Sequence, residues 1–346
     1  MENNKFQPIV SPIICSATFS QKTPGQSGYG RVDNPSRLHL EKKLAILEKA
    51  KFALAFSSGS AAITDILCLL RSGDHVLCHW EVYEGTLRLL QQVFIKFNIS
   101  FELVDFKNLE KLKKATRKET KMLWFENMTN PTLQLIDTKK INTVVKNKNI
   151  IVVVDNTFCT PVFANPLESG ATIVAHSLTK FINGHHDVLA GAIMLNNKQL
   201  FKKLNFLQHT IGAVPSAFDC FLVERGIETL EIRMEKITAS SKLIAEFLSK
   251  HPKIDKVSFP GFSGLISFWI KGTKNTLKVI NNFKKIKIAH SLGGTVTTVM
   301  HPQSMMSFSL AKEVLAHMGI NGNLIRMSVG LESVEEIVKD IKQALI

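Results

Sequence analysis

Short apolar segments alternate with amphipathic segments along most of this chain, and this alternation restricts the possible folds more than any other feature. Five runs rich in apolar and β-branched residues are predicted to be strands, at residues 52–56, 75–79, 100–106, 121–126 and 150–155. Segments with helical spacing, such as 60–72 and 84–97, lie between them. The pattern predicts an α/β fold of βαβ units, with a mostly parallel central sheet and helices on both faces.

The second half of the chain changes character. Two more strands are predicted at 171–176 and 190–195, followed by a long helical region at 216–250. The remainder predicts a smaller α+β domain, through segments 264–272, 275–285 and 324–331. We therefore divide the chain into an extended N-terminal arm, a large α/β domain and a C-terminal α+β domain, at residues 1–36, 37–226 and 227–346.

Cysteine content and hydropathy bear on the cellular compartment. The chain has 5 cysteines, an odd number, and no pair has CxxC spacing, so neither a disulfide framework nor a zinc site is indicated. The N-terminus has no apolar signal core, and no stretch has the length and apolar character of a membrane helix. We expect a cytoplasmic protein with no metal and no membrane partner.

The net charge of +14 raises the alternative of a nucleic-acid partner. The basic residues lie on helix-like faces, for example in 107–121 and 196–203, and do not form a tail. No basic helix with interleaved aromatic residues supports nucleic-acid binding. We interpret the charge as a solvated lysine-rich surface.

Several marked residues follow predicted strands, where open α/β sheets bind their ligands. Gly59 and Ser60 lie between a strand and a helix, an arrangement suited either to binding a phosphate or to an ordinary helix cap. Asp155 ends a strand and is either a helix cap or a buried acid with a cationic partner. Lys180 is either a solvated ammonium or a desolvated nucleophile.

One ligand requires all three features together: a phosphate cradle, an acid for a protonated ring nitrogen, and a lysine that forms a Schiff base. That ligand is pyridoxal 5'-phosphate (PLP). Ser177 and Thr179 flank Lys180 closely enough to join the phosphate site, and the ring of Tyr83 could stack on the cofactor.

The sequence resembles the Cys/Met-metabolism family of PLP-dependent enzymes, whose members perform trans-sulfuration. The resemblance runs from about Pro12 to the C-terminus and rests on a specific set of motifs: "YGRVDNPSR" (29–37), "SSGSAAI" (57–63), "VYEGT" (82–86), "NMTNPT" (127–132), "VVVDNTF" (152–158), "HSLTKFINGHHDV" (176–188), "SLGG" (291–294) and "LIRMSVGLE" (324–332). It implies PLP-dependent transferase fold type I and a PLP cofactor.

The resemblance also implies a role for individual residues. Lys180 would carry the Schiff base, and Asp155 would hold the pyridine nitrogen. Tyr83 would stack on the ring and help to move protons. The implied phosphate ligands are Gly59, Ser60, Ser177 and Thr179, with Tyr29 and Arg31 supplied by a neighbouring subunit, and the implied substrate ligands are Asn130, Ser291 and Arg326. A homo-oligomer follows, a dimer with shared sites that assembles into a tetramer.

The implied substrate is a sulfur-containing amino acid or an activated homoserine. The reaction that fits best is α,γ-elimination of cystathionine to cysteine, 2-oxobutyrate and ammonia. The alternatives are γ-replacement, as in cystathionine γ-synthesis or O-acylhomoserine sulfhydrylation, methionine γ-elimination and β-elimination. An alternative of another class is a PLP-binding assembly subunit with weak catalysis.

Three departures from the family pattern concern the substrate end of the site. The N-terminal arm starts late, and a loop that the family usually carries between residues 262 and 263 is absent. Val296 occupies the position at which the resemblance implies a glutamate facing the distal end of the substrate. A valine cannot pair with a distal ammonium group, so we expect a bias toward substrates with an uncharged distal group.

Overall fold

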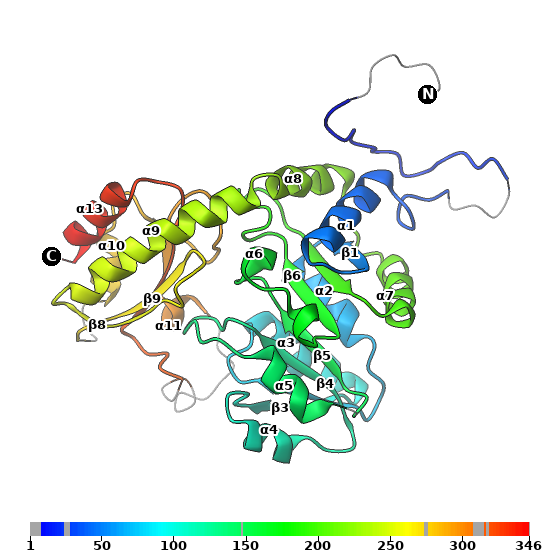
Figure 1. The fold of residues 1–346 in the computed structure, drawn as a ribbon, viewed down its shortest axis with the longest axis horizontal. Helices are drawn as coiled ribbons and strands as arrows, with labels where there is room; N and C mark the ends of the chain where they lie inside the picture. Colours follow the sequence, from blue (N-terminus) through cyan, green and yellow to red (C-terminus); the bar gives the residue numbers. More distant parts are fainter. Residues whose placement is uncertain are drawn as a thin grey trace.

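Two β-sheets organise the chain, as the ribbon in Figure 1 shows. In this computed structural model the larger sheet has 7 strands in the order β1-β7-β6-β5-β4-β2-β3, and the smaller has 5 in the order β10-β11-β12-β9-β8, counted over the described residues. The structure describes residues 8–23, 28–146, 148–272, 276–306, 315 and 318–345. Parts of two predicted segments, residues 1–7 and 24–27 of the arm and residue 275, lie outside them.

The larger sheet is mostly parallel, as predicted. Strand β7 runs antiparallel to both of its neighbours, β1 and β6, and the remaining pairs are parallel. Its strands are β1 (Phe52–Phe56), β2 (His75–His79), β3 (Ser100–Val104), β4 (Thr120–Glu126), β5 (Ile151–Asp155), β6 (Ile173–Ser177) and β7 (Gly191–Leu195).

Helices cover both faces of this sheet because its strands are apolar on both sides. One face packs against α2, α3 and α7, through residues such as Ile66, Leu90 and Leu204. The other face packs against α1, α8, α4 and α5. The bounds are α1 (Pro35–Leu47), α2 (Gly59–Leu67), α3 (Glu84–Gln92), α4 (Leu109–Ala115), α5 (Thr138–Val145), α6 (Thr160–Phe163), α7 (Lys198–Ile211) and α8 (Ala217–Ile227), with 3-10 turns η1 (Phe94–Phe97) and η2 (Pro166–Ser169).

The smaller sheet lies at the far end of α9, a 21-residue helix that runs from α8 across to the C-terminal part of the chain (Figure 1). Helices α9 and α13 pack together and, with α10, enclose a separate apolar core. The elements are α9 (Leu230–Lys250), β8 (Ile254–Ser258), β9 (Leu265–Ile270), α10 (Thr276–Asn282), β10 (Lys287–Ile288), β11 (Thr298–Met300), α11 (Pro302–Met305), β12 (Leu324–Ser328) and α13 (Val334–Ala344).

Several helix boundaries differ from the sequence prediction. Helix α2 ends at Leu67 and α3 at Gln92, and the predicted helix at 216–250 is two helices, α8 and α9. The break follows from Gly226, whose carbonyl accepts hydrogen bonds from the Thr229 N–H and from the Arg233 side chain. The Gly226 carbonyl therefore accepts hydrogen bonds other than the regular bond from the N–H four residues on.

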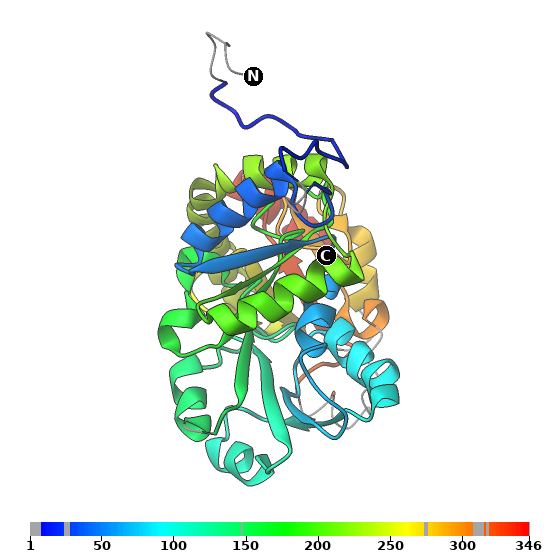
Figure 2. The ribbon, with the colours of Figure 1, turned by 90° about the vertical axis from the view of Figure 1, so that its right-hand side faces the viewer.

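The arm also differs from the prediction at its end. Helix α1 begins at Pro35, within the segment 1–36, because the Asn34 side chain caps it by accepting from the N–H groups of Ser36 and Arg37. Figure 2 shows the chain before α1 running outward from the body of the protein. The predicted domain boundaries at 36 and 226 remain predictions.

One edge of the larger sheet gathers the residues of interest. Since β1, β2, β4, β5 and β6 all run in the same direction, their carboxyl ends meet at one edge, and β7 starts there. Gly191 permits this start: a Cβ at this position would lie 2.3 Å from the Ser58 carbonyl oxygen. The fold thus brings strand-end residues from distant parts of the sequence together.

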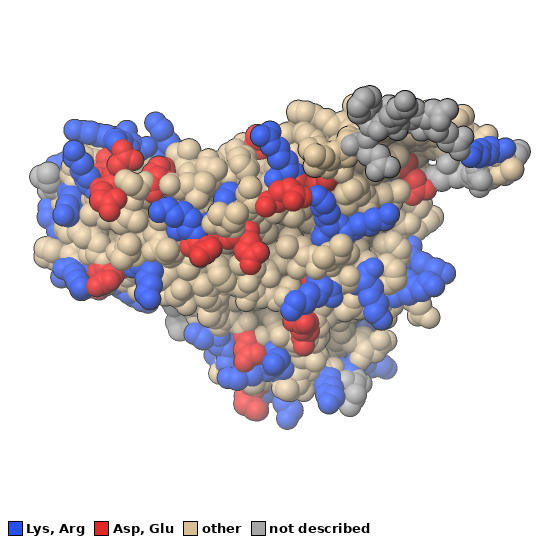
Figure 3. All heavy atoms as spheres, turned by 45° about the horizontal axis from the view of Figure 1, so that its top comes forward, with Lys and Arg blue, Asp and Glu red and all other residues tan. Residues whose placement is uncertain are grey.

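The basic residues were interpreted from the sequence as a solvated, lysine-rich surface. On the face shown in Figure 3, Lys and Arg side chains are spread over the surface with Asp and Glu between them. Among the described helices, none has the length and apolar character needed to cross a membrane.

We predict that Arg233 is a main support of the loop that carries Lys180. Arg233 is 5% exposed, and its guanidinium donates to the carbonyls of Phe181 (2.7 Å), Ile182 (3.2 Å) and Gly226 (2.7 Å). Arg233→Met should leave the Phe181 and Ile182 carbonyls without their Arg233 donors and lower the melting temperature by about 5 °C or more. Lys236→Met, at an exposed position of the same helix, is the control and should change it little. Equal melting temperatures for the two variants would contradict this role.

Candidate active site

A pocket opens at the carboxyl edge of the larger sheet, between the two sheets. The strand ends of the larger sheet and the turns and helix starts that follow them supply most of its wall, and His290, Leu292 and Arg326 supply the rest. Most of the residues predicted from the sequence line it together: Gly59, Ser60, Tyr83, Asn130, Asp155, Ser177, Thr179, Lys180 and Arg326.

The N-terminus of α2 forms one end of the pocket. Ser58 caps this helix, and its side chain accepts from the Ala61 N–H at 3.0 Å. Gly59 and Ser60, the first two residues of the helix, line the pocket. A Cβ on Gly59 would lie 3.1 Å from the Ser177 Cβ, so glycine permits the close approach of α2 to β6. The helix end and the Ser177 hydroxyl together suit an anion such as a phosphate.

Asp155 stands at the end of β5 and lines the pocket. Its Oδ1 accepts from the Thr157 N–H at 2.9 Å, and the Thr157 hydroxyl accepts from the Ser177 N–H at 2.8 Å. Burial raises the pKa of Asp155, whereas the bonds from Thr157 and the charge of His176 act to lower it. A fixed carboxylate in these surroundings suits a protonated ring nitrogen.

Lys180 Nζ donates to the Oγ of Ser291 at 3.0 Å, and Ser291 lies in the segment between β10 and β11. Burial, followed by the positive charge of Arg326, lowers the pKa of Lys180 from 10.5 to about 8. A substantial fraction of the amine is therefore neutral near pH 8 and able to attack a carbonyl carbon.

Arg326 is a buried cation on β12, only 3% exposed. Its Nη1 donates to Asn130 Oδ1 at 2.8 Å and its Nη2 donates to the His290 carbonyl at 3.2 Å. Its Nε has no partner among the described residues, and no carboxylate there forms an ion pair with it. A buried guanidinium without a counter-ion suits a bound carboxylate.

Tyr83 stands at the mouth of the pocket and is 40% exposed. Its backbone N–H donates to Glu126 Oε1 at the end of β4. A Cβ on Gly85 would come within 2.3 Å of the Tyr83 ring, so glycine at 85 leaves room for the ring. The ring is positioned to cover a flat ligand.

Several pocket residues were not predicted from the sequence, among them Glu126, Thr157 and His176. Glu126 had the same signal as Asp155, an acid at the end of an apolar strand. Burial, followed by the charge of Asp155, raises the pKa of Glu126 well above its usual value. Glu126 therefore favours its neutral form beside Asp155.

Tyr29 and Arg31 lie away from this pocket, near residues 214–218. Arg31 donates to the carbonyl of His209 and stacks over the Tyr29 ring. In this structure Arg31 is therefore held by contacts within its own chain. Their contribution to a neighbouring subunit remains a prediction.

Two other predicted residues are Thr179, which holds the Lys180 loop, and Val296, which is exposed. The Thr179 hydroxyl donates to the Ala190 carbonyl and accepts from the Ala190 N–H, at 3.2 and 3.0 Å, which fastens the Lys180 loop to the start of β7. Val296 is 42% exposed and is not among the pocket-lining residues. The proposed effects of Thr179 on phosphate and of Val296 on substrate choice remain predictions.

The arrangement fits PLP on structural grounds. The pocket combines a helix end suited to an anion, the Asp155 carboxylate and a desolvated lysine, and it adds a buried guanidinium for a second anionic group. These are the groups that would bind the phosphate, the ring nitrogen, the aldehyde carbon and a substrate carboxylate.

Comparison with known proteins gives consistent results. Residues 1–346 match the family described as Cys/Met metabolism PLP-dependent enzyme. The chain is 41% identical to cystathionine gamma-lyase of Dictyostelium discoideum over 97% of this chain and 92% of that protein. It is 40% identical to cystathionine beta-lyase of Coxiella burnetii over 97% and 93%. Among solved structures, cystathionine gamma-lyase from Lactobacillus plantarum complexed with L-serine has a TM-score of 0.93 at 31% identity, over 96% of this chain and 92% of that one.

We predict that Lys180 is the most reactive lysine of the cofactor-free protein near pH 8. Its acylation, followed by mass spectrometry as a function of pH, should have a midpoint near 8, against about 10.4 for exposed lysines. Arg326→Met removes a positive charge that disfavours the ammonium form, so the midpoint should rise. Arg117→Met, at an exposed position, is the control. A midpoint near 10 in the unaltered protein would contradict the lowered pKa.

Proposed function

Because the chain belongs to the family of Cys/Met metabolism PLP-dependent enzymes, we propose that it is a C–S lyase that cleaves cystathionine by α,γ-elimination. With one water molecule consumed, the products would be cysteine, 2-oxobutyrate and ammonia. The observation that carries this proposal is the meeting of Asp155, Lys180 and Arg326 in one pocket. Similarity to cystathionine γ-lyases over nearly the whole chain supports cleavage of the bond between the γ-carbon and sulfur.

The proposed binding roles follow from the geometry. Gly59, Ser60 and Ser177 would bind the cofactor phosphate, and Asp155 would hold its ring nitrogen. Tyr83 would cover the ring at the mouth of the pocket. When bound, PLP withdraws electrons from the substrate α-carbon and so makes its proton acidic.

Arg326 and Asn130 would orient the substrate. The Arg326 guanidinium would bind the substrate carboxylate, with Asn130 setting the guanidinium plane through their 2.8 Å bond. The α-carbon would then face Lys180, which Ser291 holds in place.

Lys180 would first bind the aldehyde carbon of the cofactor and then act as the general base. Its neutral amine would take the α-proton of the substrate at Nζ. The pKa of about 8 suits this task, because the neutral amine is available near neutral pH and the ammonium can return the proton. The same amine would move protons within the substrate so that the sulfur leaves from the γ-carbon.

A second candidate reaction is β-elimination of the same substrate, favoured by the 40% identity to two cystathionine β-lyases. Val296 is predicted to make the protein favour substrates with an uncharged distal group. Methionine and O-acetylhomoserine are therefore further candidate substrates. A homo-oligomer in the cytoplasm remains our prediction for assembly and location.

Products distinguish these reactions. The protein with PLP is incubated with cystathionine, methionine, O-succinylhomoserine, or O-acetylhomoserine with sulfide, and the keto acid and thiol are identified. We expect 2-oxobutyrate and cysteine from cystathionine, whereas β-elimination would give pyruvate and homocysteine. Lys180→Ala should abolish turnover, and Lys121→Ala, at an exposed position, should not. A folded, PLP-loaded protein that converts none of these substrates would contradict the proposal and favour a binding subunit.

We predict that each site is completed by the arm of a second subunit, through Tyr29 and Arg31. Lys180→Ala and Arg31→Ala chains, each inactive alone, should regain activity when mixed, because a hybrid can combine an intact pocket with an intact arm. A mixture of Lys180→Ala with Asp155→Asn is the control, since both changes fall in the pocket and no hybrid has a complete one. Equal activity of the two mixtures after confirmed subunit exchange would contradict a shared site.

A further inference from the structure

Three neighbouring strands of the smaller sheet carry a row of polar side chains that the proposed function uses only in part. Arg326 on β12 pairs with Ser267 on β9, and Ser267 pairs with Ser258 on β8. Residues that pair across neighbouring strands point their side chains to the same face of a sheet. We call these three residues the polar row. Arg326 has a proposed role in substrate binding, whereas the two serines have none.

The polar row lies on the face of the smaller sheet that points away from its apolar core. The residues on either side of Ser267 and Arg326 all belong to that core, namely Ile266, Phe268, Ile325 and Met327. Because side chains alternate between the two faces of a strand, Ser267 and Arg326 point the other way. Ser267 is nevertheless fully buried, so its hydroxyl requires a hydrogen-bond partner within the protein.

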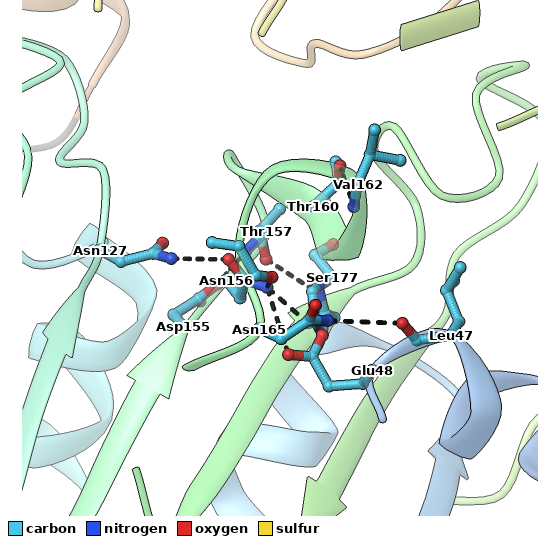
Figure 4. A network of polar contacts seen from close by, with 12 residues as sticks. Leu47, Glu48, Asn127, Asp155, Asn156, Thr157, Thr160, Val162, Asn165 and Ser177 are labelled. Carbon is cyan, nitrogen blue, oxygen red and sulfur yellow. Dashed lines mark hydrogen bonds and ion pairs between the residues drawn. The ribbon is translucent and has the colours of Figure 1, made fainter. Parts of the chain in front are cut away.

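The partner of the polar row is a loop of the larger sheet, residues 127–136, which follows β4. Its base is fixed to the larger sheet: the Asn127 side chain donates to Asn156 Oδ1 at 2.7 Å, as Figure 4 shows. The Ile136 N–H donates to the Asn127 carbonyl at 3.0 Å, and the Thr129 N–H donates to the Gln134 carbonyl at 2.9 Å. These bonds join the two sides of the loop and leave residues 130–132 at its tip.

Each member of the polar row binds one of three successive residues at this tip. The bonds run from Arg326 Nη1 to Asn130 Oδ1 (2.8 Å), from the Ser267 hydroxyl to the Pro131 carbonyl (2.5 Å) and from the Ser258 hydroxyl to the Thr132 carbonyl (2.8 Å). The tip therefore lies along the row, with one residue of the tip bound to each strand. This contact joins the loop of the larger sheet to the smaller sheet beside the pocket.

The contact fixes the acceptor that orients Arg326. The guanidinium donates to Asn130 through Nη1 and to the His290 carbonyl through Nη2. Asn130 can hold the guanidinium in one orientation only if its own backbone is held. Proline has no N–H, so the carbonyl that accepts from Ser267 is the only backbone group through which Pro131 can be hydrogen-bonded. The bond from Ser267 therefore restrains the residue next to Asn130.

We propose that Ser267, with Ser258 beside it, is a positioning residue that holds residues 130–132 against the smaller sheet, so that Asn130 and Arg326 bind a substrate carboxylate in one orientation. The inference rests on the proposed role of Arg326. Loss of the Ser267 hydroxyl should weaken binding of the carboxylate group and leave binding of the rest of the ligand unchanged. Loss of the Ser258 hydroxyl should have a smaller effect, because the Thr132 side chain also donates to Glu81, at 2.6 Å.

Two amines that differ only at the carboxyl group separate this role from general support of the fold. L-Alanine carries the carboxylate, and L-alaninamide carries a neutral amide in its place. Each is titrated into the PLP-loaded protein, and its dissociation constant is obtained from the change in the visible absorption of the cofactor. The ratio of the two constants, alaninamide over alanine, is compared between variants. The difference in basicity between the two amines is the same for every variant and cancels in this comparison.

The variants are Ser267→Ala and Ser258→Ala, and Arg326→Met is the reference. Ser241→Ala is the matched control. Ser241 on α9 is fully buried like Ser267, and its hydroxyl has no hydrogen-bond partner among the described residues. The control therefore removes a buried hydroxyl in the same part of the chain without touching the loop 127–136.

We expect Ser267→Ala to lower the ratio by about three- to tenfold, the effect of one lost hydrogen bond, and Ser258→Ala to lower it by about twofold. Ser241→Ala should match the unaltered protein. A folded Ser267→Ala protein with an unchanged ratio overturns the inference. If Ser267→Ala does not fold, an unchanged ratio in Ser258→Ala overturns it.

The Arg326→Met reference distinguishes failure of this inference from failure of the proposed function. If Arg326→Met lowers the ratio and neither serine variant does, the inference is overturned while the proposed role of Arg326 stands. If Arg326→Met leaves the ratio unchanged, Arg326 does not bind the carboxylate, and this inference fails with the proposed role.

Discussion

The site depends on charged groups being removed from water without losing their partners. Asp155, Lys180 and Arg326 are all drawn into one pocket between the two sheets. Burial lowers the pKa of both cations and raises that of the acid, so the fold alone would tend to neutralise the site. Thr157 and His176 oppose this for Asp155. A bound cofactor and substrate would supply the counter-charges that the cations lack.

The two sheets contribute different groups to the pocket. The larger sheet brings strand ends to one edge and so sets the phosphate cradle, Asp155 and Lys180 in a fixed relation. The smaller sheet supplies Arg326 from β12 and the segment with Ser291 that contacts Lys180. Helix α9 links the two, and Arg233 on it bonds to the loop after Lys180. Relative placement of the sheets therefore sets the relation between cofactor groups and substrate groups.

Much of this was predictable because strand ends are visible in the sequence. An apolar run that ends in Asp155, or a turn with Gly59, has a local signal, and parallel strands bring such ends together. Partners distant in sequence gave no signal: Glu48 and His176 meet only in the fold. The break between α8 and α9 involves the Gly226 carbonyl, which accepts from Arg233, and the position of Arg31 involves its contact with His209. Neither contact can be read from the periodicity of the sequence.

The central claim is that Lys180 holds PLP opposite Asp155, and borohydride reduction of the PLP-loaded protein tests it most directly. Reduction fixes the cofactor to the amine that binds it, and mass spectrometry of the peptides identifies the lysine. We predict that the reduced cofactor is found on Lys180 and that Lys180→Ala carries none. Reduced cofactor on a different lysine of the folded, unaltered protein would contradict the account.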